Sequence, residues 1–273
     1  MKIAQFIQDG RLGLGLVEEG GLAPLDFAGD MLDFIAGDRT AARKTGRPIP
    51  LGQVRLAPPV TRPGKIIGIG LNYRDHAEEQ NAKIPAEPRL FAKFATTLIG
   101  PGDPIVWERA VTGQVDFEAE LAVVIGRAVK NCPEDQALAA VFGYACANDV
   151  SARDIQLAKG ELVRGKSLDT FCPLGPWIVT TDEIPDPGAL TVRCRLNGAL
   201  MQEGTTAMLI FGIPALVAFL SRSFTLLPGD VILTGTPKGV GVFRNPPVFL
   251  KDGDEVVVEV ERIGRLVNTC RAA

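Results

Sequence analysis

Three carboxylates lie within or just after two apolar segments of the chain. Glu118 and Glu120 belong to residues 116–126, a run that predicts a strand, and Asp149 follows a second apolar run, residues 141–147. Because strand side chains alternate between faces, the two glutamates should point the same way. Buried neighbouring carboxylates repel each other unless a cation neutralises them or one takes up a proton. The alternative is that the glutamates line the polar face of an edge strand and that Asp149 begins a turn.

Such a trio forms a hard oxygen site, which suits Mg²⁺ or Mn²⁺, with Ca²⁺ as a possible substitute. Zinc would favour His or Cys ligands, and the chain contains one His. Water or a substrate would fill the remaining coordination positions.

The single histidine, His76, lies three residues before Glu79. The sequence predicts a helix over residues 72–81 with Asn72 as its N-cap, and on such a helix His76 and Glu79 share a face. A carboxylate beside an imidazole orients the ring and strengthens it as a base, which suits activation of water. The alternative is an exposed helix face with scattered charges.

Four further polar residues are candidates for holding a substrate. A capping-box pattern predicts a helix over residues 151–159, on which Arg153 and Gln156 share a face and offer hydrogen-bond donors. Lys166 lies in a predicted loop. Thr236 lies in a Gly/Thr turn directly after an apolar strand, where backbone N–H groups and its hydroxyl could hold an anionic oxygen. Each of these patterns also occurs in proteins without a ligand there.

Many short strands must position these residues, because the 273-residue chain contains 30 Gly and 20 Pro, which favours turns between short elements. A hairpin is predicted over residues 2–18, and further helices over 25–36 and 206–221. Further strands are predicted at residues 65–69, 104–107, 117–125, 141–147, 177–180, 190–196, 231–234, 255–261 and 265–270.

Strands and helices do not alternate regularly along the chain, which argues against a doubly wound or TIM-barrel architecture. We expect a mixed α/β, β-dominated fold whose strands curl around a central site. A Pro-rich segment, residues 57–64, predicts a boundary between a small N-terminal domain, residues 1–60, and a larger domain, residues 61–273.

The composition excludes several classes of protein. The net charge is −3 without a long basic run, which argues against nucleic acid as a partner. The longest apolar stretch, residues 207–220, contains Pro214 and is too short to span a membrane. The five Cys form no CxxC motif, which argues against a disulfide framework or a thiolate zinc site. The start of the sequence does not resemble a signal peptide, so we expect a cytoplasmic protein.

Five segments resemble, in order, the motifs of the fumarylacetoacetate hydrolase (FAH) family, and the resemblance runs from about residue 63 to the C-terminus. The first 60 residues are similar to the small leading domain of many bacterial members. The five segments are residues 70–76 (GLNYRDH), 116–121 (DFEAEL), 148–154 (NDVSARD), 165–167 (GKS) and 234–241 (TGTPKGVG).

The resemblance implies an FAH-type mixed β-roll with a small N-terminal α+β domain, and a homodimer. It implies that Glu118, Glu120 and Asp149 bind Mg²⁺ or Mn²⁺. It further implies roles in catalysis or in substrate binding for six residues: His76 and Glu79 as a catalytic dyad, Lys166 as a group that steadies an oxyanion, Arg153 and Gln156 as substrate contacts, and Thr236 as the ligand of the substrate carboxylate.

The implied activity is chemistry on a small 2-oxo acid through a metal-bound enolate. We favour C–C bond hydrolysis of an acylpyruvate-type substrate. The alternatives are isomerisation of 2-hydroxyhepta-2,4-diene-1,7-dioate in aromatic catabolism, and decarboxylation or tautomerisation of oxaloacetate. An alternative from another class is a non-catalytic, metal-stabilised binding protein.

Overall fold

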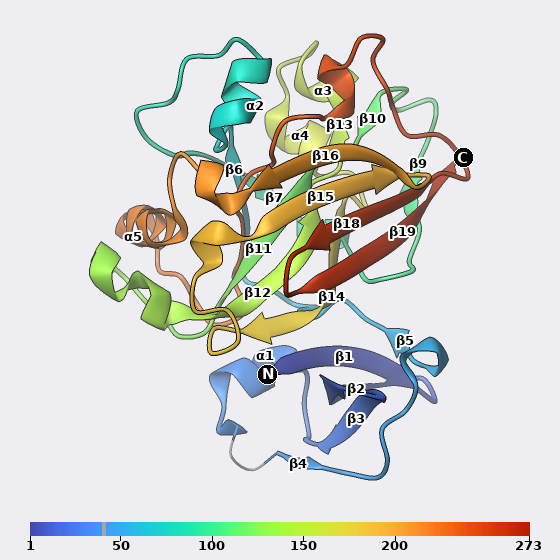
Figure 1. Ribbon diagram of the computed structural model, residues 1–273, viewed down its shortest axis with the longest axis vertical. Coiled ribbons are helices and arrows are strands. Elements are labelled where there is room, and N and C mark those ends of the chain that lie inside the picture. Colours follow the sequence, from blue (N-terminus) through green and yellow to red (C-terminus); the bar gives the residue numbers. More distant parts are fainter. Residues whose placement is uncertain (40–41) are drawn as a thin grey trace.

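The computed structural model describes residues 1–39 and 42–273 and is dominated by β-strands (Figure 1). Residues 40 and 41, between the predicted first helix and the Pro-rich segment, lie outside the described part. Within the described residues, twelve strands form the largest sheet. These strands are β1 (Lys2–Gln8), β2 (Arg11–Glu18), β3 (Gly21–Asp26), β4 (Arg43–Lys44), β5 (Arg55–Leu56), β6 (Ile66–Gly70), β7 (Arg89–Lys93), β8 (Leu98–Ile99), β11 (Ala119–Ile125), β12 (Val141–Asn148), β14 (Cys172–Thr180) and β17 (Val231–Leu233).

The order along this sheet is β4-β3-β2-β1-β14-β12-β11-β17-β6-β7, with β5 paired to β1 and β8 to β14. A second sheet has the order β16-β15-β18-β19-β9, and β10 pairs with β13. The bounds of these strands are β9 (Ile105–Trp107), β10 (Val115–Asp116), β13 (Ser151–Ala152), β15 (Thr191–Leu196), β16 (Ala199–Thr205), β18 (Glu255–Val260) and β19 (Gly264–Ala272).

Helices are short and few in the described part of the chain. The α-helices are α1 (Met31–Ala36), α2 (Arg74–Glu79), α3 (Arg153–Gln156), α4 (Leu162–Lys166) and α5 (Ile213–Ser223), and the 3-10 helices are η2 (Leu51–Gln53), η3 (Ala95–Thr97), η4 (Glu134–Ala140), η5 (Pro187–Ala189), η6 (Thr206–Met208) and η7 (Gly241–Phe243). None of the described helices has the length and apolar character needed to cross a membrane. The predicted β-dominated class is confirmed.

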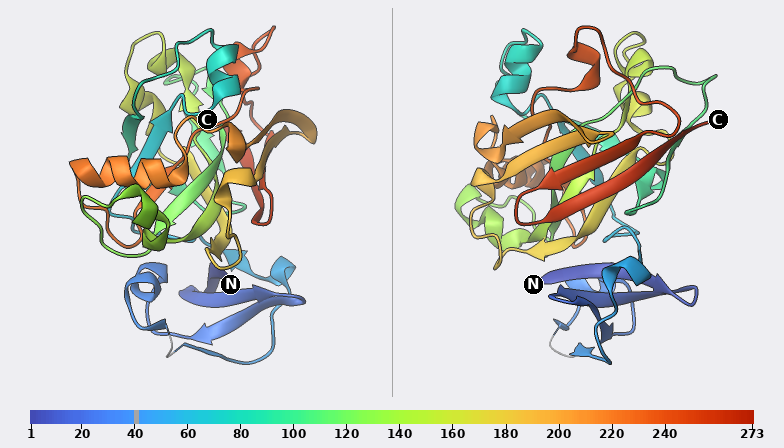
Figure 2. Two further views of the ribbon diagram at one scale, coloured as in Figure 1. Left: turned by 60° about the vertical axis from the view of Figure 1, so that its left-hand side comes forward. Right: turned by 45° about the vertical axis from the view of Figure 1, so that its right-hand side comes forward.

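The N-terminal part of the chain lies as a separate layer at one end of the molecule (Figures 1 and 2). Its hairpin turns where predicted, at Asp9 and Gly10, which both have positive φ. Strand β1 joins this layer to the rest through antiparallel pairing with β14.

The predicted helix over residues 25–36 is wrong in its first half, because β3 continues to Asp26 and the helix begins only after Asp30. The Asp30 side chain accepts hydrogen bonds from the backbone N–H groups of Leu32 and Asp33 and completes a capping box with Asp33.

Three other predicted helices are shorter than expected. Asn72 is not an N-cap, since its side chain instead binds backbone groups of Phe211 and Thr234. Ser151 does not cap a helix either; it lies in β13 and donates to the Asp149 carbonyl. The helix predicted over residues 206–221 begins at Ile213, after a separate 3-10 turn, and Pro214 lies in its first turn, where proline fits.

Each predicted strand segment overlaps an observed strand, and eight observed strands were missed: β3, β4, β5, β7, β8, β10, β13 and β16. Most of the core lies between the two large sheets (Figure 1). In β11, Leu121 and Val123 belong to this core together with Val192 and Val258 of the second sheet. Ala122 packs on the opposite side of β11 in another cluster. By strand alternation Glu120 shares the face of Ala122, and therefore points away from the second sheet toward α2, α3 and α4.

Candidate active site

The three predicted carboxylates lie together in the interior. Glu118, just before β11, Glu120 in β11 and Asp149, just after β12, each offer an oxygen within 4.8 Å of the other two. All three are buried, with exposed fractions of 6%, 2% and 1%. They meet because β11 and β12 pair antiparallel, which brings the beginning of one strand beside the end of the other. The backbone N–H of Asp149 donates to the Glu118 carbonyl at 2.9 Å and fixes this junction.

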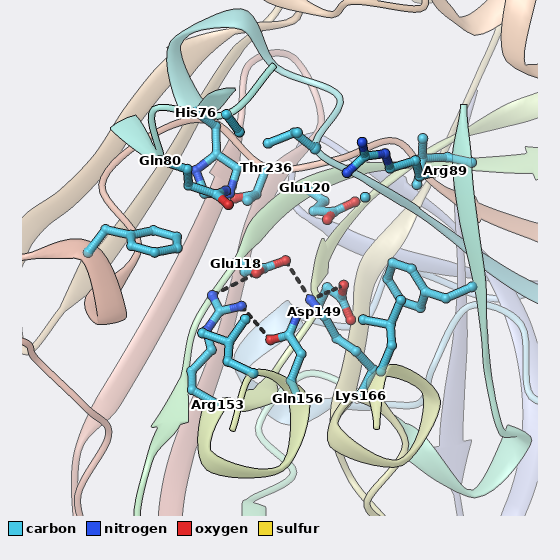
Figure 3. A pocket seen from close by; sticks show the side chains of 18 residues that line it. His76, Gln80, Arg89, Glu118, Glu120, Asp149, Arg153, Gln156, Lys166 and Thr236 are labelled. Atoms are coloured by element: carbon cyan, nitrogen blue, oxygen red, sulfur yellow. Dashed lines mark hydrogen bonds and ion pairs between the residues drawn. The ribbon is translucent and has the colours of Figure 1, made fainter. Parts of the chain in front are cut away.

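Buried cations compensate two of these carboxylates. Lys166 Nζ donates to Glu118 Oε2 at 2.7 Å and to Asp149 Oδ2 at 2.6 Å (Figure 3). Arg153 Nη2 lies 2.7 Å from Glu118 Oε1 and forms an ion pair with it. Burial alone would raise the pKa of Glu118, but the charges of Lys166, Arg153 and the nearby His76 lower it to about 2.

Glu120 is not compensated in this way. Its Oε2 accepts a hydrogen bond from the Gly235 backbone N–H at 2.7 Å. Burial, followed by repulsion from Asp149 and Glu118, raises the pKa of Glu120 well above its ordinary value. A cluster of three buried carboxylates, one of them without a partner cation, fits a hard divalent ion such as Mg²⁺ or Mn²⁺, which would supply the missing positive charge. The donor set is therefore compatible with the metal that the sequence predicted.

The histidine and its carboxylate partner lie on α2, directly after β6. His76 Nδ1 is 2.8 Å from Glu79 Oε2, and Glu79 Oε1 accepts a hydrogen bond from the Gly239 backbone N–H at 2.8 Å. With an anionic partner at Nδ1, the ring carries its proton there, so Nε2 is the basic nitrogen. The Gln80 amide lies 2.6 Å from Nε2 and donates to it. His76 is buried and lines the same cavity as the carboxylates.

Of the predicted substrate-binding residues, Arg153, Gln156 and Lys166 lie on the opposite side of this cavity from His76, whereas Thr236 lies on the same side as His76 (Figure 3). Arg153 and Gln156 share a face of α3, and Arg153 Nη1 donates to Gln156 Oε1 at 2.8 Å. Lys166 ends α4 rather than lying in a loop, and its ammonium has a third N–H left for a ligand. Thr236 lines the cavity, but its hydroxyl donates to the Ala119 carbonyl at 2.9 Å and accepts from Gln202.

The cavity that unites these groups has a volume of about 250 Å³. Its wall combines the polar residues with apolar side chains from β6, β7, α4 and the segment after β17. The lining residues are Ile69, Gly70, Leu71, His76, Gln80, Ala82, Arg89, Phe91, Glu118, Glu120, Asp149, Arg153, Gln156, Leu157, Leu162, Lys166, Thr236 and Phe243.

Sequence reasoning missed several residues that support the site. Asp116 anchors Arg153, whose Nε donates to Asp116 Oδ2 at 2.8 Å, and it also accepts the backbone N–H groups of Gly241 and Val242. Lys93 is buried and donates to Asp149 Oδ1 at 2.6 Å and to the Lys166 carbonyl. Asp116 stands in the same charged run as the glutamates, which is a local signal, whereas nothing near Lys93 in the sequence indicates its partner.

A β-dominated fold with a buried carboxylate trio facing a histidine–carboxylate pair is the arrangement of an enzyme whose acidic cluster could bind a divalent metal ion. Residues 65–271 match the family described as "Fumarylacetoacetate (FAA) hydrolase C-terminal", and residues 1–59 match "Rv2993c-like, N-terminal". The chain belongs to the fumarylacetoacetate hydrolase family, so the family prediction is confirmed.

One curated relative and two solved structures resemble the chain over nearly its whole length. The mitochondrial oxaloacetate tautomerase Fahd2a of Rattus norvegicus is 42% identical over 98% of this chain and 91% of its own. A fumarylacetoacetate hydrolase from Exiguobacterium antarcticum has a TM-score of 0.89 and 39% identity, with both chains fully covered. A 2-hydroxyhepta-2,4-diene-1,7-dioate isomerase from Mycobacterium marinum has a TM-score of 0.83 and 38% identity over 100% of this chain and 98% of that one.

Proposed function

We propose that the protein catalyses keto–enol tautomerisation of a small 2-oxo acid of the oxaloacetate type, with Mg²⁺ or Mn²⁺ bound by Glu118, Glu120 and Asp149. The observation that carries this proposal is the single cavity lined both by the buried carboxylate trio and by His76. The rat relative named as an oxaloacetate tautomerase favours this reaction over the hydrolysis that the sequence alone suggested.

The bound ion would supply Lewis-acid stabilisation of negative charge next to the substrate carboxylate. His76 Nε2 takes the proton from the carbon beside the 2-oxo group, while Glu79 holds the ring at Nδ1 and stabilises the imidazolium that forms. The proton is then delivered to the 2-oxygen, and the reverse transfers regenerate the keto form. Because Gln80 donates to Nε2, this amide must release the ring before the base can act.

Charged donors around the cavity orient the substrate. Lys166 uses two N–H groups on Glu118 and Asp149, and its third can stabilise a developing oxyanion. Arg153 Nη2 pairs with Glu118 Oε1 at 2.7 Å, and its second N–H can donate to a substrate oxygen. Thr236 can donate to a substrate carboxylate only if its hydroxyl leaves the Ala119 carbonyl, so this assignment stays a prediction.

A second candidate is C–C bond hydrolysis of an acylpyruvate. It is favoured by the similarity to the Exiguobacterium hydrolase, and the His76–Glu79 pair would then deprotonate a water molecule. The two reactions can be distinguished by their products. Tautomerisation interconverts two forms of one acid, whereas hydrolysis consumes water and releases pyruvate and a carboxylic acid.

The test is a substrate panel followed with Mg²⁺, with Mn²⁺ and after chelation. We expect metal-dependent decay of the ultraviolet absorbance of enol-oxaloacetate, without pyruvate formation in a coupled assay, and slower or no turnover of acetylpyruvate. Release of pyruvate from acetylpyruvate at a higher kcat/KM would select hydrolysis instead. Failure of every acid in the panel to react would refute both.

A matched pair of variants tests the dyad. Glu79→Gln removes the carboxylate at His76 Nδ1, whereas Glu78→Gln changes the neighbouring, exposed glutamate of the same helix. We expect the first to lower kcat by about tenfold to a hundredfold, since the imidazolium loses its counter-charge, and the second to leave it unchanged. Equal activities of the two variants would remove Glu79 from the mechanism.

Other expectations from the sequence remain predictions. The homodimer would be checked by light scattering, and the division near residue 60 by expression of residues 61–273 alone. The cytoplasmic location and a role in aromatic catabolism also stay predictions, and the rat relative is named as mitochondrial.

A further inference from the structure

One face of β7 runs from the carboxylate cluster to the mouth of the cavity. Arg89, Phe91 and Lys93 alternate with Leu90 and Ala92, so the first three side chains share a face. Lys93 is buried against Asp149, Phe91 is buried in the cavity wall, and Arg89 is exposed but lines the same cavity. Each two-residue step along a strand covers about 7 Å, which places Arg89 two such steps from the floor of the site.

The cations around the cavity differ in whether they already form ion pairs with carboxylates of the protein. Arg153 is paired with Asp116 and Glu118, and Lys166 with Glu118 and Asp149. The Arg89 side chain forms no ion pair or hydrogen bond with any residue in the described part of the chain. In Figure 3 its guanidinium end points into the space beside Glu120 rather than away from the cavity.

The net charge of the inner site indicates which substrate group Arg89 can bind. The inner site holds four carboxylates, those of Asp116, Glu118, Glu120 and Asp149, against the three cations Lys93, Lys166 and Arg153, which leaves one negative charge. A divalent ion would turn this into one positive charge, enough for the single carboxylate beside the 2-oxo group. A second substrate carboxylate would need a further cation.

We propose that Arg89 binds the distal carboxylate of a 2-oxo dicarboxylic acid and thereby makes the site selective for diacids over monoacids. A guanidinium can hold a carboxylate through two parallel hydrogen bonds, and Phe91 provides an apolar surface for the carbon chain between the two ends. This inference rests on the proposed function only in that the 2-oxo end binds at Glu118, Glu120 and Asp149.

The experiment compares the binding of two five-carbon acids that differ only at the distal end, 2-oxoglutarate and 2-oxovalerate. Calorimetric titration in the presence of Mg²⁺ gives the ratio of their dissociation constants for the wild-type protein, Arg89→Gln and Arg222→Gln. The last variant removes an exposed arginine on α5, which does not line the cavity. We expect the wild type and Arg222→Gln to bind the diacid at least tenfold more tightly than the monoacid, and Arg89→Gln to lose most of this preference by weakening the diacid alone.

Loss of affinity for both acids in equal measure, or no preference for the diacid in the wild type, would overturn the inference. The binding ratio does not depend on turnover. If oxaloacetate is not tautomerised but the ratio still depends on Arg89, the inference stands while the proposed reaction fails. If tautomerisation occurs and Arg89→Gln keeps the wild-type ratio, the proposed reaction stands and the inference fails.

Discussion

The substitution Glu120→Gln tests the electrostatics on which the site depends. It keeps the size of the side chain and the acceptor for the Gly235 N–H, but removes the carboxylate that lacks a partner cation. The three carboxylates offer oxygens within 4.8 Å of one another. At this separation and an effective dielectric constant of about 20, two like charges repel by about 3 kcal/mol. Lys166 offsets part of this repulsion, so we expect the metal-free variant to be about 2 kcal/mol more stable than the wild type at pH 8.

The stability gained by Glu120→Gln should increase as the pH rises. The folded protein raises the pKa of Glu120, so as the pH rises above the ordinary value the unfolded chain releases this proton first. The wild type therefore loses stability with rising pH until the folded pKa is passed, while the glutamine variant does not. The difference in free energy of unfolding should be near zero below about pH 4 and grow toward pH 8.

The assay is urea unfolding at pH 4.5, 6 and 8 with a chelator, repeated at pH 8 with Mg²⁺. Metal that binds only the folded state stabilises the wild type by about 2.7 kcal/mol at a concentration a hundredfold above its dissociation constant, and should stabilise the variant much less. Glu255→Gln, at an exposed position, is the control and should follow the wild type. A variant that is less stable than the wild type in chelator at pH 8, or that gains as much from Mg²⁺, would refute the reasoning.

Three further variants test the neighbouring groups. His76→Ala should keep the fold and metal affinity but lower kcat by about a hundredfold to ten-thousandfold, because the base is lost; full activity would disprove its role. Glu118→Gln should weaken Mg²⁺ binding in a calorimetric titration, and unchanged affinity would remove Glu118 from the ligand set. Lys93→Met should destabilise the protein by about 3 kcal/mol or more in urea, because a buried carboxylate loses one cation, whereas Lys83→Met, at an exposed position, should not; similar stabilities would contradict the ion pair with Asp149.

The positions of the acidic residues could be predicted from local pattern. Alternation along residues 117–125 places Glu118 and Glu120 on one side of a strand, and the i, i+3 spacing of His76 and Glu79 brings their side chains into contact at 2.8 Å. The hairpin at Asp9 could also be predicted from the sequence, because its turn residues favour positive φ.

Helix ends were predicted less well, because competing partners distant in the sequence decided them. Asn72 has the side chain of an N-cap, yet it binds Phe211 and Thr234, which lie more than a hundred residues away. Ser151 and Asp154 match a capping box, yet Asp154 accepts hydrogen bonds from Thr112 and Gly113 instead. A local motif states which bonds a side chain can make, and the tertiary structure determines which it does make.

The sequence by itself determined the family, the common face of Glu118 and Glu120, and the i, i+3 spacing of His76 and Glu79, because these depend on residue type and on spacing within single elements or motifs. That Asp149 lies beside the two glutamates depends on the pairing of β11 with β12. Only the tertiary structure decided which charges are compensated. Lys93 reaches Asp149 across 56 positions of sequence, and Arg89 lines the cavity mouth from the same edge strand. Strand periodicity specifies the face on which a side chain lies but not the element that packs against it, so charge balance in the site follows from sheet order and not from local pattern.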